Sequence, residues 1–472
     1  MQTRVLGAVG IGLLLAARVA TAQDTSAVAR DTASANPPRP CGFCPRPSLP
    51  FALFQTVLIN VSVNRFDAWG LQADWARVTP ETWRSNLRLG WTWDQDAFRP
   101  NMLEHPYNGA AYYNAARSNG LSYWAGVPVT AFGSAVWEYF GETNRPSIND
   151  IVNTSLGGVA LGEMFHRIAE TIRDNQASGG GRLLRELAAL PLDPVGSANR
   201  FMVGDWWHHG PNPVEHNPVA MIVRTGGGAG IVREPGAGLK GASWSSVFFA
   251  DVRYGDPYVD RFTKPFDSFE MQALFAPRHG NLTMLRGEGR LLSTELGAEN
   301  KWHRHQLELN QRFEYLNNDA YQFGGQTLEL ALTSRVHLSG KFWLRTLMGG
   351  DAIVLAGIDA PNAGTGLRKY DFGPGAGGTA ELTIEHSEVP YLTFHFQPAI
   401  VRTLSGADAT HVTSQGLIEA NIPLFDWLAL ALQSTYYTRS SRYADGTRNK
   451  KSFPEMRIFL ALRSAHRPVI AP

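Results

Sequence analysis

The feature that most constrains the fold is a strict alternation of polar and apolar residues, which recurs from about Ser243 to Ser464. In "QLELNQRFEY", Glu308 and Arg312 share one face while Leu309 lies on the other. Alternation over about ten residues is typical of a half-buried antiparallel strand. Such strands exceed the ~5–6 residues common in soluble sandwiches, and they match the ~9–11 residues of a tilted strand crossing a bilayer. The pattern therefore predicts a transmembrane β-barrel.

The barrel should be closed, because an open sheet edge in lipid would leave backbone N–H and C=O groups unpaired. About eleven alternating segments follow Ser243, and residues 218–232 supply a candidate twelfth. Leu309, Leu330, Leu430 and Leu460 are expected to face lipid, and Glu308, Glu329 and Arg457 the lumen. A soluble sandwich or a lipocalin-like barrel is the alternative.

The N-terminus is typical of a secretory signal over residues 1–22. It has Arg4, an apolar run "VLGAVGIGLLLAA" and small residues "ATA" before a cleavage point. The run is shorter than the ~20 residues of a spanning helix. We therefore expect the protein in the cell outer membrane, after signal cleavage. Residues 23–50 form a Pro/Ser/Ala-rich tether in which Cys41 and Cys44 predict a local disulfide; a redox or metal role is the alternative.

Composition limits the partners. The net charge is +1 and only 18% of residues are charged, so nothing favours binding to nucleic acid. Two GxGxxG matches lie outside any strand–turn–helix unit, so no nucleotide and no other cofactor is expected. The expected partners are outer-membrane lipid, the barrel-insertion machinery and a small-molecule or lipid ligand.

The organisation along the chain predicts an α+β fold. Residues 51–178 read as helical, 179–240 as a Gly/Pro-rich connection with a candidate first strand, 241–464 as the barrel and 465–472 as a tail. The prediction is an N-terminal helical segment followed by a C-terminal antiparallel transmembrane β-barrel of about 12 strands. We expect the helices to plug the lumen or to cap its periplasmic mouth.

Two carboxylates interrupt the least polar segment. Glu138 and Asp150 each lie about one turn from the short loop "GETNRPS". One helical turn rises ~5.4 Å, so both should sit at one level of an antiparallel hairpin. Asn153 is the nearest spare donor, and Arg145 or Arg117 the expected cation. The pair is either a structural latch or an acid–base or metal site, and the candidates for catalysis are His105, Glu138, Asp150 and Asn153.

Histidines gather in the loop "WWHHGPNPVEH". His208, His209 and His216 are candidate metal ligands, since imidazoles bind zinc and other transition metals. Adjacent histidines rarely both point inward, and the spacing fits no standard zinc site. A loop role without metal is favoured.

Four motifs occur in order between His105 and Asp205: "HPYNGAAYYNAARSNG", "WEYFGE", "SINDIVNTSLGGVALGE" and "DPVGSANRFMVGD". They resemble the signatures of an uncharacterised bacterial envelope family, filed as a domain of unknown function. The resemblance implies a Gram-negative envelope protein without an established activity. A helix Glu followed by a "D..N...G" helix is also similar to VanZ-like membrane proteins, which implies that Glu138, Asp150 and Asn153 form a polar core.

These observations favour an outer-membrane barrel that binds or passes a small or lipidic molecule, or that supports envelope architecture. An enzyme is less favoured. That alternative is an envelope lipid- or glycan-modifying enzyme using Glu138, Asp150 and His105.

Overall fold

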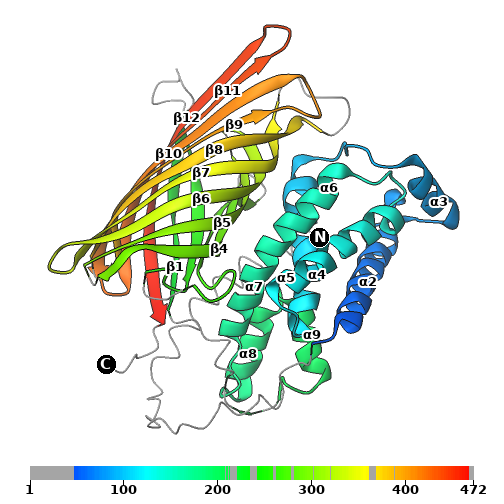
Figure 1. The fold of residues 1–472 in the computed structure, drawn as a ribbon, viewed down its shortest axis with the longest axis horizontal. Coiled ribbons are helices and arrows are strands. Elements are labelled where there is room, and N and C mark those ends of the chain that lie inside the picture. Colours follow the sequence, from blue (N-terminus) through cyan, green and yellow to red (C-terminus); the bar gives the residue numbers. More distant parts are fainter. Residues whose placement is uncertain are drawn as a thin grey trace.

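The computed structural model describes residues 47–207, 209–210, 212, 220–233, 242–258, 262–277, 281–300, 302–318, 320–360, 368–386 and 389–466. Within these ranges the chain forms two parts, a helical region and a β-barrel, which lie side by side (Figure 1). The predicted signal peptide, residues 23–46 of the predicted tether and both cysteines fall outside the described residues, whereas Leu49 and Pro50 at the end of that tether already belong to the first described helix.

The helical region contains eight α-helices among the described residues. They are α2 (Leu49–Arg65), α3 (Pro80–Leu89), α4 (His105–Ser118), α5 (Tyr123–Val136), α6 (Ile148–Val152), α7 (Gly158–Ile172), α8 (Gly179–Ala189) and α9 (Pro194–Met202). Single π-helical turns continue several of them: η2 (Phe66–Gly70), η4 (Pro100–Glu104), η5 (Trp137–Gly141) and η6 (Asn153–Gly157). Among the described residues, no helix is both long and apolar enough to span a membrane.

Glycines set the packing of α4 against α7 at the centre of this region. A Cβ atom on Gly158 would lie 2.5 Å from the Cα of Gly109, and one on Gly109 would lie 1.9 Å from the carbonyl oxygen of Thr154. The two backbones therefore meet where no side chain intervenes. Close approach through small residues is the packing mode common between helices in membranes.

The barrel has twelve strands. They are β1 (Met221–Arg233), β2 (Ala242–Tyr254), β3 (Phe269–Ala276), β4 (Asn281–Asn300), β5 (His303–Asn317), β6 (Gln322–Ser339), β7 (Phe342–Asp359), β8 (Tyr370–His386), β9 (Val389–Arg402), β10 (Ala409–Phe425), β11 (Leu428–Tyr443) and β12 (Arg448–His466). Each pairs antiparallel with its neighbours, and β1 pairs with β12 to close the ring. The predicted fold class and strand number are confirmed.

The alternation has the predicted orientation. Glu329 is 0% exposed while the next residue, Leu330, is 56% exposed. Leu460 is 54% exposed and Arg457 is buried among polar lumen side chains. Leu309 points outward but is half-buried, because it packs against the core of the helical region. The wall is thus apolar outside and polar inside, as a membrane barrel requires.

The helical region docks on the outer wall of the barrel. Met164 of α7 fills the space over Gly287, and Met102 fills the space over Gly324. Both glycines alternate with lumen-facing residues, so the contact is external. Gln311 of β5 accepts a hydrogen bond from the Tyr123 hydroxyl at 2.7 Å. The expectation of a plug or cap is wrong, because the helices bury outward-facing strand residues beside the barrel (Figure 1).

The two ends of the barrel differ. One end holds the short connections β6–β7, β8–β9 and β10–β11 together with the start of β1 and the end of β12. We call it the short-turn end. The connection between β11 and β12 is short: the two strands stay paired from Leu428 to Arg442, and the turn occupies only residues 444–447. This hairpin projects at the opposite end (Figure 1).

Candidate functional site

The lumen is crossed by ion pairs between opposite walls. Arg253 of β2 lies 3.3 Å from Glu385 of β8, and these two strands occupy opposite positions of the ring. Arg345 of β7 reaches Glu270 of β3 at 3.3 Å. Long side chains, and not the helical region, therefore occupy the lumen near the short-turn end.

Glu385 is the centre of this group. Besides Arg253, it pairs with Arg345 at 3.2 Å and with Arg335 at 3.6 Å. The Tyr258 ring, from the β2–β3 connection, lies 5.9 Å from the Arg335 guanidinium and 5.7 Å from that of Arg345. The connection thus folds into the mouth and holds the two arginines against Glu385. Cation–π contacts of this kind add to the ion pairs.

A second layer crosses the lumen further in. Arg312 of β5 is 1% exposed in its side chain and pairs with Glu288 at 3.2 Å, Glu329 at 3.0 Å and Asp351 at 2.5 Å. A guanidinium offers five donors in a rigid fork, which suits several carboxylates at once. Arg286 of β4 meets His395 of β9 at 3.2 Å. Side chains therefore also bridge opposite walls at this second level, through Arg286 and His395.

A cavity of about 240 Å³ remains among these layers, toward the short-turn end. Residues from all twelve strands line it, including Arg224, Asp251, Glu270 and Glu419. Arg224 pairs with Glu419 at 2.7 Å across its floor. The lining carries both signs of charge, so the cavity suits a small polar solute.

The helical region holds a second polar site around Glu138. Glu138 is 3% exposed, and its Oε2 atom accepts a hydrogen bond from the Ser147 backbone N–H at 2.7 Å. Its Oε1 atom is buried and has no hydrogen-bond partner among the described residues. The hydrogen bond between Glu138 and Ser147 joins η5 to the start of α6, as the predicted hairpin requires. The other carboxylate oxygen is left without a compensating partner among the described residues.

Asp150 has two partners, of which His105 was a candidate from the sequence and Asn149 was not. Asn149 donates to its Oδ1 atom at 2.7 Å, and His105 Nε2 lies 3.6 Å from the same oxygen. The other ring nitrogen of His105 lies 3.3 Å from the Thr154 hydroxyl. The structure thus brings His105 and Asp150 together as a pair held from both sides.

Burial dominates the electrostatics of this site. Burial, followed by the Asp150 carboxylate, raises the pKa of Glu138 well above its usual range. Burial, followed by Asp94, does the same to the pKa of Asp150. The pKa of Glu142 rises to about 7 through burial, which His105 and the Trp137 N–H oppose. Desolvation and like charge both favour the protonated carboxyl.

Three sequence-based expectations for this site are wrong. Arg145 is exposed and donates to the Leu89 and Gly90 carbonyls. Arg117 pairs with Glu163 at 2.7 Å. Asn153 donates to the Asn101 carbonyl and lies against Met102, so it does not serve Asp150. Among the described residues, no Lys or Arg lies within ion-pair distance of Glu138 or Asp150, which leaves the His105 ring as the nearby side chain that contacts Asp150.

Asp94, Asp96 and Glu142 were not singled out from the sequence. Residues 90–96 lie across the start of α6, because Thr92 exchanges backbone hydrogen bonds with Pro146 and Ile148 at 2.8 Å. The Asp94 N–H donates to Asn149 at 2.9 Å. In the sequence, Asp94 and Asp96 are marked only as two acids that follow a pair of tryptophans in "WTWDQDAF". The site therefore depends on a tertiary contact that spacing does not reveal.

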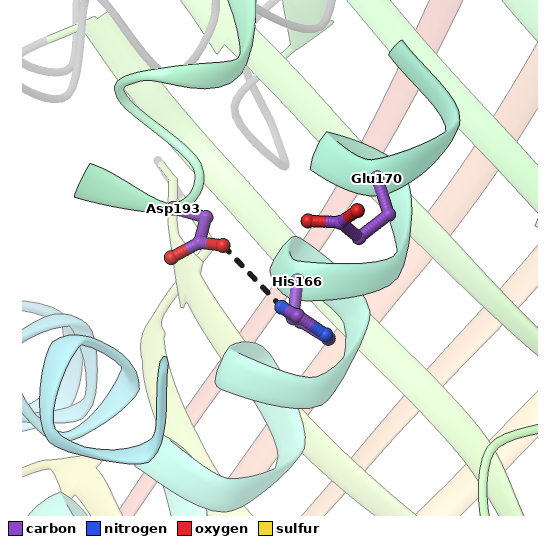
Figure 2. A group of neighbouring side chains, drawn as sticks. All are labelled: His166, Glu170 and Asp193. Atoms are coloured by element: carbon purple, nitrogen blue, oxygen red, sulfur yellow. Dashed lines mark hydrogen bonds and ion pairs between the residues drawn. The ribbon is translucent and has the colours of Figure 1, made fainter. Parts of the chain in front are cut away.

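Figure 2 shows a further cluster, in which His166 and Glu170 of α7 face Asp193. His166 Nδ1 lies 3.3 Å from Asp193 Oδ2. Arg173 occupies the same carboxylates: it pairs with Glu170 and reaches Asp193 at 3.1 Å. Asp193 also caps α9 through the Gly196 N–H at 2.8 Å. Although burial opposes it, Arg173 lowers the pKa of Asp193. The cluster is a buried ion-pair network rather than a free set of metal ligands.

The remaining candidates are not brought together. His209 is exposed, and His208 and His216 lie outside the described residues, as do Cys41 and Cys44. Of the two GxGxxG matches, the described one lies in β8, where a Cβ on Gly373 would meet the Arg402 carbonyl oxygen at 1.9 Å. That glycine permits close strand pairing at a bulged stretch of the barrel.

Residues 90–195 match the model of a family described as a domain of unknown function, DUF3943. The match spans the first three motifs and ends at the start of the fourth, and the expected resemblance is confirmed. It covers most of the helical region and none of the barrel. No curated protein sequence matches this chain.

Several solved structures are similar to the barrel part. The NanC porin shares 9% identity over 51% of this chain and 98% of its own, with a TM-score of 0.25. The toluene transporter TodX of Pseudomonas putida shares 8% identity over 52% and 92%, with a TM-score of 0.23. OmpT, an outer membrane protein of Vibrio cholerae, shares 7% identity over 52% and 98%, with a TM-score of 0.22.

Proposed function

We propose that the protein is an outer-membrane channel for small polar solutes that its own lumen side chains hold closed. The single observation that carries this proposal is the Arg253–Glu385 pair, which joins opposite strands of the ring at 3.3 Å. Flexible side chains form the closure, and a cavity of about 240 Å³ lies among them.

The wall supports the membrane location. Its outward residues are apolar and its inward residues carry charge, which is the distribution of a transmembrane barrel. The alternating register continues around all twelve strands and leaves no unpaired edge. A solute that enters from the short-turn end meets Tyr258 and the arginines on Glu385 first.

The test is the conductance of the full-length protein in planar lipid bilayers in potassium chloride. The wild type should show no steady open level. The double variant R253A/R345A removes two cross-lumen cations and should open a steady conductance. R402A is the matched control, since Arg402 is largely exposed and pairs with Asp408 away from the lumen. A wild type that conducts freely, or a double variant as silent as R402A, would overturn the proposal.

A second function is favoured by one observation in the helical region. The buried, unpartnered Oε1 atom of Glu138 lies in the same site as the His105–Asp150 pair. A protonated carboxyl beside a His–Asp pair is an arrangement suited to acid–base chemistry on an envelope lipid or glycan. The test compares lipid and glycan extracts by mass spectrometry from cells carrying the wild type or E138Q. An unchanged extract at equal protein level would exclude this function.

A further inference from the structure

Helix α2 buries its polar side chains and exposes its apolar ones. Its buried residues are mostly polar, and Gln55, Thr56 and Asn60 are no more than 6% exposed. Its outer face is apolar: Phe54 is 59% exposed and Leu58 51%. From Phe51 to Val61, every residue of α2 that is not buried is apolar. In a helix that faces water the arrangement is the reverse.

The inward polar side chains of α2 are satisfied within the helical region. Asn60 donates to the Gly133 carbonyl at 2.9 Å. Asn64 donates to the Ala76 and Gly141 carbonyls at 2.8 and 2.9 Å. Each bond joins α2 to another segment rather than to its own turn. A surrounding without hydrogen-bond donors or acceptors requires that polar groups find all their partners inside the helix bundle.

The apolar outer face extends beyond α2. On α5, Trp124 is 57% and Phe132 39% exposed. Exposed tryptophans gather past the C-terminal end of α2, at Trp69 and Trp75. With 17 residues, α2 is about 25 Å long, close to the ~25 Å apolar band of outer-membrane barrels. Tryptophans beside such a band are typical of the boundary between acyl chains and headgroups.

The helical region that carries this face stands on the barrel wall. The helical region covers the outer side of β4, β5 and β6 through Met164, Gln311 and Met102. Further along the same strands the wall is bare, and Leu330 and Leu332 are exposed. The helices lie against the wall itself, so a lipid layer around the bare part of the wall would lie beside them (Figure 1).

We infer that the outer face of α2 contacts the acyl chains of the membrane, so that the helical region lies beside the barrel within the lipid. This inference rests on the proposed membrane location of the barrel. Acyl chains fit the face because it offers them apolar side chains and keeps amides and hydroxyls inside. Inside the helical region, Glu138 and Asp150 lie at the end that the exposed tryptophans mark. This end is identified by Trp137, next to Glu138, which packs against Trp75.

The test uses site-directed spin labels on the full chain in phosphatidylcholine vesicles, with Cys41 and Cys44 replaced by serine. Single cysteines are placed at Leu58 on α2, at Leu330 on the barrel and at Gln176 in the exposed α7–α8 connection. Oxygen, which partitions into lipid, and a water-soluble nickel chelate are the two relaxants. Leu58 should resemble Leu330, with high oxygen and low nickel accessibility, while Gln176 shows the reverse.

The accessibilities at these sites distinguish lipid, water and protein as the surroundings of α2. Leu58 accessible to nickel like Gln176 would place α2 in water and overturn the inference while leaving the barrel in lipid. Low accessibility to both relaxants would mean that protein covers the face, a second copy included, and would also overturn it. Nickel access at Leu330 itself would defeat the membrane location and the inference together. A label at Phe54, equally exposed, repeats the test should L58C perturb packing.

Discussion

The Glu138 carboxylate accepts the Ser147 backbone N–H at 2.7 Å and so ties η5 to the start of α6. The same carboxylate keeps its second oxygen buried without a partner among the described residues. One oxygen therefore has a structural task that a neutral amide also performs. The other is where a proton, a solute or a substrate would make a difference.

Replacement of Glu138 separates these tasks. E138Q retains an oxygen for the Ser147 N–H and should leave resistance to proteolysis unchanged. E138L leaves that buried N–H unsatisfied, which should cost about 1–3 kcal/mol and expose the α5–α6 hairpin to protease. Limited proteolysis of both variants measures the difference. Equal cleavage of E138Q and E138L would contradict a structural role for the carboxylate.

The stability of the helical region should fall as pH rises. Burial raises the pKa of Glu142 from its ordinary 4.5 to about 7 in the folded protein, so the folded state binds its proton more tightly. Its contribution is complete below about pH 4.5 and is lost as pH rises through about 7. The pKa values of Glu138 and Asp150 are raised and act in the same direction. Protease resistance at pH 5 and pH 8 should show this loss.

The variant E142Q is the control for that pH dependence. An amide cannot titrate, so the difference between pH 5 and pH 8 should shrink. A helical region that becomes more resistant with rising pH would contradict the raised pKa values.

The close contact of α4 and α7 should not tolerate a side chain. A Cβ at Gly109 meets the backbone oxygen of Thr154 at 1.9 Å, and a backbone atom moves only with its helix. G109V should therefore destabilise the helical region by about 1–3 kcal/mol through overpacking. G180A is the matched control, because a Cβ at Gly180 on α8 meets nothing within 4 Å. Urea unfolding followed by proteolysis compares them, and equal midpoints would disprove the contact.

The barrel wall should reject charge where it is bare. L460R puts a guanidinium on an outward site that is 54% exposed, and near the bilayer midplane this costs ~2–4 kcal/mol of barrel stability. L309R acts elsewhere, because Leu309 packs against the helical core, and it should loosen the helices first. Heat-modifiable migration in detergent gels reports the barrel, and proteolysis reports the helices. A harmless L460R would show that the site faces water.

The barrel was predictable because the two-residue period of a strand is fixed by backbone geometry. The alternation of Glu329 and Leu330 therefore carries over directly into the structure. The docked helices were not predictable in the same way. Phe313, under the helices, and Leu307, on the bare wall, follow the same alternation. Periodicity distinguishes inward from outward, but not one apolar neighbour from another.

The helical site was predictable only in its backbone. The rise per turn placed Glu138 and Asp150 on either side of one hairpin, and after burial the Asp150 carboxylate raises the pKa of Glu138. The partners of these acids came from elsewhere, since Asn149 and His105 serve Asp150. Arginine side chains are long and find acceptors in several directions, so a position in sequence did not determine where Arg117 and Arg145 bind.

Two outward-facing glycines, Gly287 and Gly324, leave notches in the outer wall of the barrel. These notches link the evolution of the barrel to that of the helical region. Met164 sits over Gly287 and Met102 over Gly324, where a barrel bathed by lipid alone has no reason to lack side chains. The glycines of the strands thus match the methionines of the helical region. Recombination that exchanged one part without the other would lose this fit. A related barrel sequence that keeps glycine at these two positions should be encoded with the helical region upstream. One that has larger residues there should lack the helical region.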